Sequence, residues 1–229
     1  MTNKSGTNSW SNFYVDQNGG NTHNLYPENF VTRVFLSKSP IQFLDESYQD
    51  KLILDLGCGH GRHIPFLLNC GFNVTGLEVS DDQVAHLQAT FRDQAHFCCG
   101  SASSIPCENH SFDFVLASNS IYYLDGNHQG IKTHLEECKR VLKDGGKLIF
   151  SLLDRNHSLF DGAITNECED ILTIRKDFLG FRDGVRIQVH GDKTMQILQE
   201  AFNVLHTGEV LESVGKHRRH FHYYVASSL

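Results

Sequence analysis

The sequence contains no hydrophobic run long enough to cross a membrane. Its longest apolar stretches, such as KLIFSLL around Phe150, fall far short of the roughly 20 residues that a membrane-spanning helix needs. It also lacks an excess of positive charge, because 20 Lys and Arg against 27 Asp and Glu give a formal net charge of −7. Since binding along a nucleic acid normally requires a basic face, we expect neither a nucleic-acid partner nor a membrane partner.

The sequence also gives no sign of secretion. The N-terminus lacks the charged start and apolar stretch of a secretory signal, which favours a cytoplasmic location. The seven cysteines are odd in number and lie mostly in apolar strand patterns, which argues against a disulfide framework. With 40% hydrophobic and 21% charged residues, a chain of 229 residues is expected to form one globular domain with additional segments.

Apolar runs of strand length alternate with helical patterns from Lys51 onward. Ser80 and Gln83 have capping-box spacing and predict the start of a helix, and further helices are expected over residues 61–70 and 130–145. This alternation is typical of βαβ units and a mostly parallel sheet. The five predicted strands lie in KLILDLG, FNVTGLEVS, AHFCCG, SFDFVLASNS and KLIFSLLD, and a terminal antiparallel hairpin is expected from NVLHTGEVLESV and HFHYYVASS.

Two segments fall outside this alternation. Residues 1–50 are predicted to form an N-terminal extension and helical lid, with one helix in YPENFVTRVFLSKSP and a second short helical piece in IQFLDESYQ. This extension could close over a ligand pocket or simply pack on the sheet, and the sequence leaves both open. Within the domain at 51–229, residues of about 154–192 are rich in Asp, Asn and Gly and are expected to form a substrate-binding insertion.

Three glycines at every second position follow the first predicted strand, in ILDLGCGHGRHIPFL. Such a turn lets the backbone approach a ligand that side chains would block. A dinucleotide-binding GxGxxG turn is disfavoured because Arg62 occupies the third glycine position, and the Gly-Lys-Ser/Thr ending of a P-loop is absent. Glu78 ends the second strand, 19 positions beyond Gly59, and a carboxylate there can accept both hydroxyls of a ribose.

The DLGCGHG turn, the acid at Glu78 and the LKDGGKLIFS join together resemble the class I S-adenosylmethionine-dependent methyltransferases, over roughly Lys51 to Asp154. The resemblance implies an α/β, Rossmann-like, doubly wound fold with a seven-stranded, mostly parallel sheet and a C-terminal antiparallel hairpin. It also implies S-adenosyl-L-methionine as the cofactor. By the same resemblance, the residues in contact with the cofactor would be Asp55, Gly57, Cys58, Gly59, Glu78, Val79, Ser101, Ala102 and Asn119.

The resemblance gives several of these positions a role. Glu78 would hold the ribose, Val79 would lie against the adenine, and Asn119 would face the sulfonium. Asp55 and the glycines of the turn would line the methionine part. Ser101 stands where the family usually carries an acidic residue beside the adenine amino group, so this contact would come from a hydroxyl.

Catalytic candidates should lie at the carboxyl ends of the strands, where ligands bind in open α/β sheets. Tyr122, Asp154 and His157 meet this condition. His157 is the first candidate for a general base because an imidazole pKa lies close to neutrality, while Asp154 could equally cap the turn that follows it. His220 and His222 share a strand face, but the preceding position on that face is an arginine, so no metal site is predicted.

These features predict an enzyme that transfers a methyl group to an oxygen or nitrogen of a small-molecule acceptor, such as a sugar or another envelope or secondary-metabolite precursor. The alternative is a catalytically inactive S-adenosylmethionine-binding protein with a regulatory or partner role. A nicotinamide-dependent oxidoreductase is disfavoured by the glycine spacing. The acceptor, the choice between oxygen and nitrogen, and the oligomeric state, monomer or homodimer, remain open.

Overall fold

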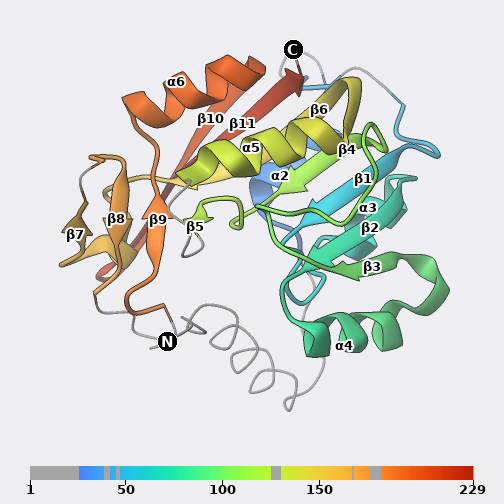
Figure 1. Ribbon diagram of the computed structural model, residues 1–229, viewed down its shortest axis with the longest axis horizontal. Coiled ribbons are helices and arrows are strands. Elements are labelled where there is room, and N and C mark those ends of the chain that lie inside the picture. The colour runs from blue at the N-terminus through green and yellow to red at the C-terminus, as the bar shows by residue number, and fades with distance from the viewer. Residues whose placement is uncertain are drawn as a thin grey trace.

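A seven-stranded sheet forms the centre of the protein (Figure 1). The computed structural model describes residues 26–38, 42–44, 47–124, 130–166, 168–175 and 182–228. Within them the strand order is β10-β11-β6-β4-β1-β2-β3. The strands of this sheet are β1 (Leu52–Leu56), β2 (Asn73–Glu78), β3 (His96–Cys99), β4 (Phe112–Ala117), β6 (Leu142–Leu153), β10 (Phe202–Val214) and β11 (His217–Ser228).

The sheet is mostly parallel, as predicted. β1 pairs in parallel with β2 and β4, and the outer pairs β2 with β3 and β4 with β6 are parallel as well. β11 is antiparallel to both β6 and β10, so it alone runs against the other strands of this sheet. The predicted C-terminal hairpin is therefore confirmed, with β11 inside the sheet and β10 at its edge.

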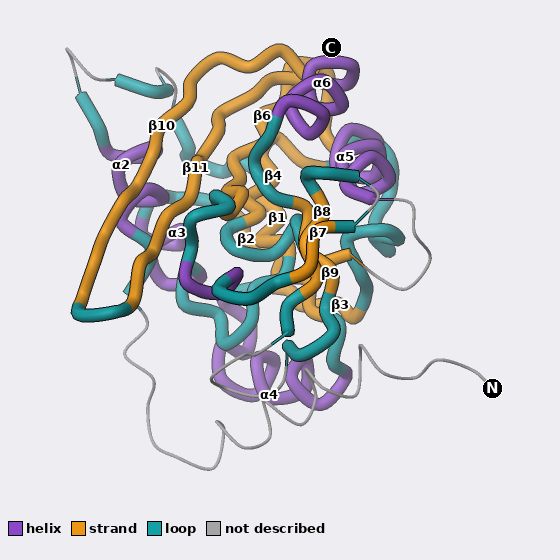
Figure 2. The backbone as a smooth tube through the Cα atoms, turned by 90° about the vertical axis from the view of Figure 1, so that its left-hand side faces the viewer, coloured by secondary structure: helices purple, strands orange, loops and turns teal. Residues whose placement is uncertain are grey.

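Helices cover both faces of the sheet. α2 (Asn29–Leu36) and α3 (Ile64–Asn69) lie on one side, and α5 (Gly130–Val141) and α6 (Asp192–Ala201) lie on the other (Figure 2). α4 (Asp81–Phe91) packs against β2 and β3. Helices on both faces of a parallel sheet define the doubly wound arrangement that was expected.

The start of α4 follows the capping pattern seen in the sequence. Ser80 has extended backbone angles, and its Oγ accepts a hydrogen bond of 3.3 Å from the Gln83 amide. Asp81 and Asp82 lie in the first turn, where negative charge interacts favourably with the helix dipole. Other boundaries differ by a few residues: α5 ends at Val141 rather than at 145, because Leu142 already pairs with Phe112 of β4.

The predicted helix before the sheet is present as α2, and its apolar stripe is buried against the sheet. Phe30 stacks on Tyr223 of β11 with ring centroids 5.3 Å apart. Phe35 makes edge contacts with Phe72 and Phe114 at 5.4 and 6.1 Å. The second helical piece expected in IQFLDESYQ is not seen in its described residues, 42–44 and 47–49, and residues 1–25 of the predicted lid lie outside the described residues.

The predicted insertion at 154–192 contains secondary structure that the sequence pattern did not reveal. Its elements are the short helix η2 (Ser158–Phe160) and the strands β7 (Ile164–Thr165), β8 (Ile171–Thr173) and β9 (Arg186–Gln188), which join β5 (Tyr123–Leu124) in a four-stranded antiparallel sheet. The His190 amide donates to the Leu153 carbonyl at the end of β6, and the Gln188 amide donates to the Tyr122 carbonyl. These bonds place the small sheet at the carboxyl ends of β4 and β6 (Figure 1).

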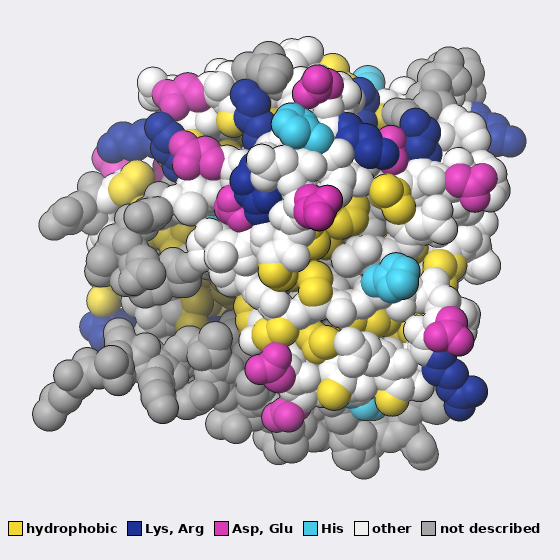
Figure 3. Space-filling view, turned by 45° about the vertical axis from the view of Figure 1, so that its right-hand side comes forward, with side chains coloured by type: hydrophobic (Ala, Val, Ile, Leu, Met, Phe, Trp, Pro, Cys, Tyr) yellow, Lys and Arg dark blue, Asp and Glu magenta, His cyan; other side chains and the backbone are white. Residues whose placement is uncertain are grey.

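The surface carries charges of both signs. On the face shown in Figure 3, Lys and Arg side chains lie among Asp and Glu side chains, and no continuous basic patch of described residues extends over it. Among the residues that the structure describes, no helix combines the length and apolar character needed to cross a bilayer.

Candidate functional site

The glycine turn after β1 lies at the carboxyl edge of the sheet, between β2 and the loop that follows β4. The amides of Gly57 and Cys58 both donate to the Leu77 carbonyl, at 2.8 and 3.0 Å. Gly57 has φ +71°, and a Cβ built there would lie only 2.5 Å from the Cβ of Ser120. Glycine is required at this position because any side chain would meet the β4 loop.

Glu78, at the end of β2, is held against this turn. Its Oε2 accepts a hydrogen bond from the Gly59 amide at 2.9 Å, and its Oε1 accepts one from the Val79 amide at 2.8 Å. The residue is only 3% exposed. Because each carboxylate oxygen can accept more than one hydrogen bond, these contacts orient the group and still permit bonds from a ligand diol.

Gln83 supports the same turn from α4, and the sequence reading did not assign it this role. Its side-chain amide donates to the Gly59 carbonyl at 2.9 Å, and the residue is fully buried. Gly59 is thus fixed through its amide by Glu78 and through its carbonyl by Gln83. The capping spacing that begins at Ser80 indicated a helix start but contained no signal for this contact.

Asp55 is a buried carboxylate beneath the turn. It is 1% exposed, and among the described residues its Oδ2 has no hydrogen-bond donor, with His63 Nδ1 3.6 Å away. Buried acceptors are nearly always satisfied, so this oxygen is suited to a donor from a ligand. The neighbouring Cys58 is buried, and this burial, with the charges of Asp55 and Glu78, raises the pKa of its thiol well above the usual value, so it stays protonated.

The loop after β3 lies beside Glu78. Glu78 pairs with Cys99 in the β2–β3 register, and the Gly100 amide donates to the Glu78 carbonyl at 3.0 Å. The hydroxyls of Ser101 and Ser103 lie 3.0 Å apart. Ala102, the residue between them, is partly buried against the core. The structure therefore brings Ser101 and Ala102 to the same edge as the turn and Glu78.

Asn119, at the end of β4, connects this edge to α2. Its backbone has φ +55°, a left-handed conformation that asparagine tolerates better than most residues. Its amide donates to Ser151 Oγ at 2.9 Å, and its side-chain Nδ2 donates to Glu28 Oε1 at 3.3 Å. Asn119 is thus fixed on both sides, between β6 and the start of α2.

Glu28 is the centre of an ion-pair network that the sequence reading missed. Arg62 Nη1 donates to its Oε1 at 2.9 Å, and Arg219 Nη2 donates to its Oε2 at 3.0 Å. Burial of Glu28 opposes its ionisation, but the charges of Arg219 and Arg62 outweigh burial and hold its pKa below the ordinary value. No local sequence pattern indicates this network, because the two arginines are 34 and 191 positions away.

The residues predicted to be catalytic lie around the small sheet. Tyr122 is buried, and burial together with Tyr123 raises the pKa of its phenol well above the usual value. The amide of His157 donates to the Asp154 carbonyl at 3.0 Å, so these two residues share one turn. His157 Nδ1 accepts a hydrogen bond of 3.0 Å from the Leu159 amide, which places the proton of the neutral ring on Nε2.

The environment of His157 keeps its ring neutral. Burial, followed by the positive charges of Arg219 and Arg182, lowers the pKa of its imidazole to about 4. Neutral imidazole is the form that a general base requires. Its Nε2–H can also donate a hydrogen bond to a ligand.

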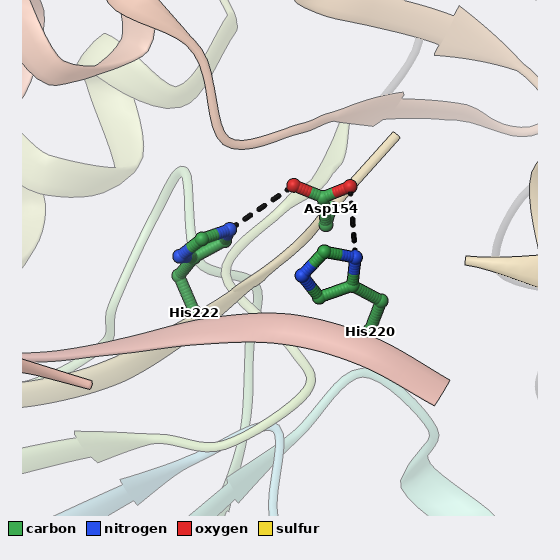
Figure 4. A group of neighbouring side chains, drawn as sticks. All are labelled: Asp154, His220 and His222. Carbon is green, nitrogen blue, oxygen red and sulfur yellow. Dashed lines mark hydrogen bonds and ion pairs between the residues drawn. The ribbon is translucent and has the colours of Figure 1, made fainter. Parts of the chain in front are cut away.

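Asp154 lies between two histidines of β11 (Figure 4). Its Oδ1 is 3.1 Å from His220 Nδ1, and its Oδ2 is 3.0 Å from His222 Nε2. His220 Nε2 in turn lies 2.5 Å from Glu209 Oε1. The sequence pattern indicated that the two histidines share one face of a strand. The pairing of β11 with β6 brings the carboxylate of Asp154 to that face, which the pattern of the single strand could not show.

Comparisons with known proteins agree with the fold and with the family that the sequence resembles. The family model described as "Methyltransferase domain" matches residues 54–150. The ubiquinone biosynthesis O-methyltransferase of Idiomarina loihiensis is 30% identical over 110 residues, which are 46% of this chain and 44% of that protein. The matched segments span about half the length of the curated relatives or less.

Solved structures match over more of the chain. A structure from Methanosarcina mazei, described as a SAM-dependent methyltransferase, has a TM-score of 0.67 at 20% identity and covers 89% of this chain and 99% of its own. The 1,6-didemethyltoxoflavin-N1-methyltransferase of Burkholderia thailandensis, solved with 1,6-didemethyltoxoflavin and S-adenosylhomocysteine, has a TM-score of 0.66 at 15% identity, covering 97% of this chain and 86% of its own. At such identities the likeness establishes the fold.

Proposed function

The chain carries a methyltransferase domain of the class I, S-adenosylmethionine-dependent family, matched over residues 54–150, and on this premise we propose that it transfers a methyl group to an oxygen or nitrogen of a small-molecule acceptor. The observation that carries the proposal is the carboxylate of Glu78, buried and oriented by the amides of Gly59 and Val79 at the carboxyl edge of the sheet. A carboxylate held in this way is suited to the hydroxyls of a ribose.

The cofactor would then extend in both directions from Glu78. Its adenine would lie toward Val79, Ser101 and Ala102, which the loop after β3 brings to the same edge. Its methionine part would lie toward the glycine turn. Asp55 supports this placement because its buried Oδ2 lacks a donor within the described residues, and the ammonium group of an amino acid is a donor.

The acceptor would approach from the side of Asn119 and the small sheet. Methyl transfer from a sulfonium is an in-line displacement, so the main task of the protein is to align acceptor, methyl and sulfur, and to exclude water. Tyr122, Asp154 and His157 are the residues proposed to contact the acceptor. Tyr122 remains a phenol because of its raised pKa, and would therefore act as a hydrogen-bond donor rather than as a base.

The segments outside the core would close this side of the site. The insertion at about 154–192 is proposed to bind the acceptor, because the Gln188 amide of β9 donates to the Tyr122 carbonyl after β4, and the His190 amide donates to the Leu153 carbonyl at the end of β6. The extension at 1–50 is proposed to act as a lid. Support for the lid comes from Glu28, which connects the start of α2 to Arg62 of the glycine turn and to Arg219 of β11.

A cytoplasmic location is part of the proposal. All seven cysteines are free in the structure, which suits a reducing compartment. A small acceptor is favoured over a nucleic acid by the net charge of −7 and by the mixed charges on the face in Figure 3.

Titration calorimetry of the purified chain with S-adenosylhomocysteine and, separately, with NAD tests the proposal. We expect one S-adenosylhomocysteine to bind per chain, no binding of NAD, and loss of binding in Gly59→Val. Incubation with S-adenosylmethionine and a panel of hydroxylated and amino acceptors should then release S-adenosylhomocysteine. A chain that binds neither compound contradicts the proposal, and binding without turnover on any acceptor would favour an inactive, regulatory protein.

A further inference from the structure

We propose that Asp154, His220 and His222 form a binding site for a divalent transition-metal ion (Figure 4). The three candidate ligand atoms all lie within 4.8 Å of one another. The two carboxylate oxygens are 3.1 and 3.0 Å from the imidazole nitrogens. When an ion binds nitrogen and oxygen ligands at about 2.0–2.2 Å, adjacent ligand atoms lie about 3 to 3.5 Å apart. The two carboxylate–imidazole pairs already have this spacing, and the remaining ligand atoms, within 4.8 Å, would move closer when an ion binds.

The fold holds the three residues in place. Because side chains alternate along a strand, His220 and His222 project from the same face of β11, and Figure 4 shows both rings directed toward Asp154. Asp154 directly follows β6, and its amide donates to the His220 carbonyl at 2.9 Å. The cluster is therefore built on β11 and on the residue directly after β6, and the backbone bond between them favours a fixed ligand geometry.

Glu209 contacts the second ring nitrogen of His220. If the Nε2–H of His220 donates to Glu209, the Nδ1 of a neutral ring carries no proton and faces Asp154 Oδ1 at 3.1 Å. Two acceptors at that distance repel each other unless a metal ion or a second ring proton lies between them. A histidine whose second nitrogen is bound by a carboxylate is the usual arrangement around a metal ligand.

His222 is held in place by its neighbours. Its ring stacks on His190 with centroids 3.8 Å apart, and His190 Nδ1 is 2.6 Å from the Tyr224 hydroxyl. The centroids of the His220 and His222 rings are 5.5 Å apart. These contacts hold the His222 ring in one orientation beside His220, which favours a preformed ligand geometry.

The ligand set indicates the kind of ion. Two imidazoles and one carboxylate suit zinc, iron(II), cobalt(II) or manganese(II), whereas calcium and magnesium prefer sites made of oxygen atoms. Three protein ligands also leave positions at which an oxygen of another molecule can bind. The cluster lies at the carboxyl edge of β6, where open α/β sheets bind their ligands.

This position gives the ion a role that rests on the proposed function. A hydroxyl acceptor bound to the ion would lose its proton to water more readily, and its oxygen would then form a bond to the methyl carbon as the carbon–sulfur bond breaks. The products would be the methyl ether, neutral S-adenosylhomocysteine and one proton. Metal binding itself does not depend on this role and can be measured without the cofactor.

The experiment uses cobalt(II) as the probe. The full-length chain is stripped of metal with a chelator, dialysed and titrated with cobalt chloride, with calorimetry and visible absorption as readouts. We expect one cobalt ion per chain, d–d absorption bands from nitrogen and oxygen ligands, and an at least 100-fold weaker affinity in His222→Ala and in Asp154→Asn. Glu209→Gln should weaken binding about 10- to 100-fold, because only the outer contact is lost. His96→Ala, an exposed histidine on β3, serves as the control and should leave the titration unchanged.

Several outcomes would overturn the metal site. These are the absence of saturable cobalt binding, or an affinity that is the same in His222→Ala as in the unaltered chain. Thermal unfolding and S-adenosylhomocysteine affinity, measured for each variant, show that the variant is folded. They also separate the two proposals: a chain that binds S-adenosylhomocysteine but not cobalt contradicts the metal site alone, and the reverse result contradicts the proposed function alone.

Discussion

Gly59 and Glu78 are joined by a hydrogen bond of 2.9 Å between the glycine amide and Oε2 of the carboxylate, across 19 positions of sequence. The same carboxylate accepts the Val79 amide, so one side chain ties the turn after β1 to the end of β2. The residue proposed to hold the ribose therefore also shapes the turn on which the rest of the cofactor would lie. Changes at Glu78 should accordingly affect binding more than the loss of two ligand bonds alone.

Glu78→Ala should weaken S-adenosylhomocysteine binding by at least about 1–3 kcal/mol, or roughly 5- to 150-fold, through the lost bonds to the ribose, with a further loss because the turn is no longer held. Glu78→Gln should lose less affinity, because its side-chain oxygen can still accept a hydrogen bond from one of the two backbone amides. Calorimetric titration measures both, and Glu136→Ala, an exposed glutamate on α5, provides the control. An unchanged affinity in Glu78→Ala would remove the ribose assignment.

Gly57→Ala tests whether the turn tolerates a side chain. Gly57 and Gly145 both have φ +71°, but a Cβ at Gly57 would lie 2.5 Å from Ser120, and a Cβ at Gly145 would meet nothing within 4 Å. Backbone strain alone should destabilise Gly145→Ala by about 1 kcal/mol. Gly57→Ala carries the same strain plus the clash, so it should unfold at lower urea concentration and bind S-adenosylhomocysteine more weakly. Equal effects of the two substitutions would contradict the close approach to Ser120.

Gln83→Leu tests the support of the turn from α4. The substitution keeps a buried side chain of similar size but removes the donor to the Gly59 carbonyl, which would cost about 1–3 kcal/mol if that oxygen stays buried. The helix start should survive, because the cap uses the backbone amide of residue 83. We expect weaker S-adenosylhomocysteine binding and faster hydrogen exchange at Gly59, with the circular dichroism of the helices unchanged. If Gln83→Leu binds S-adenosylhomocysteine with the affinity of the unaltered protein, the turn does not need this bond.

The sequence was sufficient to predict features that depend on local pattern. The strands β1, β2 and β4 are short apolar runs between helical periods, and the start of α4 follows from a serine and the amide three residues later. The spacing of the glycines indicated a turn with exposed backbone, and φ is positive at all three. Each of these predictions concerns residues within a few positions of one another, where periodicity and capping chemistry act directly.

The sequence was insufficient where function depends on which strands pair. Asp154 meets His220 because β11 enters the sheet antiparallel beside β6, and Glu28 meets Arg219 across 191 positions. No local pattern encodes such partners. The small sheet was missed for another reason: β5 and β7 have two residues each, which is too short to display an alternation.

Glu28→Gln tests the network that holds the start of α2. At pH 7 the substitution should lower the free energy of unfolding by about 1–3 kcal/mol, because a charged acceptor of two guanidinium groups is replaced by a neutral one. The lower end of this range is expected, since Arg62 and Arg219 are 46% and 44% exposed and water screens both ion pairs. Urea denaturation of both proteins between pH 7 and pH 3 measures the difference.

The pH dependence of that difference has a definite sign. The pKa of Glu28 lies below its ordinary value of 4.5 in the folded protein, because Arg219 and Arg62, with a smaller effect of His63, outweigh the opposing effect of burial. Its contribution is therefore complete above the unfolded pKa and is lost as pH falls through the folded pKa. The buried Tyr122, which also interacts with Glu28, is neutral throughout this range because its pKa is raised well above the usual value.

The free energies of unfolding of the unaltered protein and of Glu28→Gln should thus differ by a constant amount from pH 7 to about pH 5. The two values should converge as the pH falls below 4.5, the ordinary pKa of a glutamate. Other carboxylates also titrate in acid, but they are present in both proteins and largely cancel in the difference. Glu136→Gln, at an exposed position on α5, is the control, and its free energy of unfolding should be close to that of the unaltered protein at every pH. A gap that stays constant down to pH 3 would mean that Glu28 acts through packing rather than through its charge, and the ion-pair account of α2 would have to be abandoned.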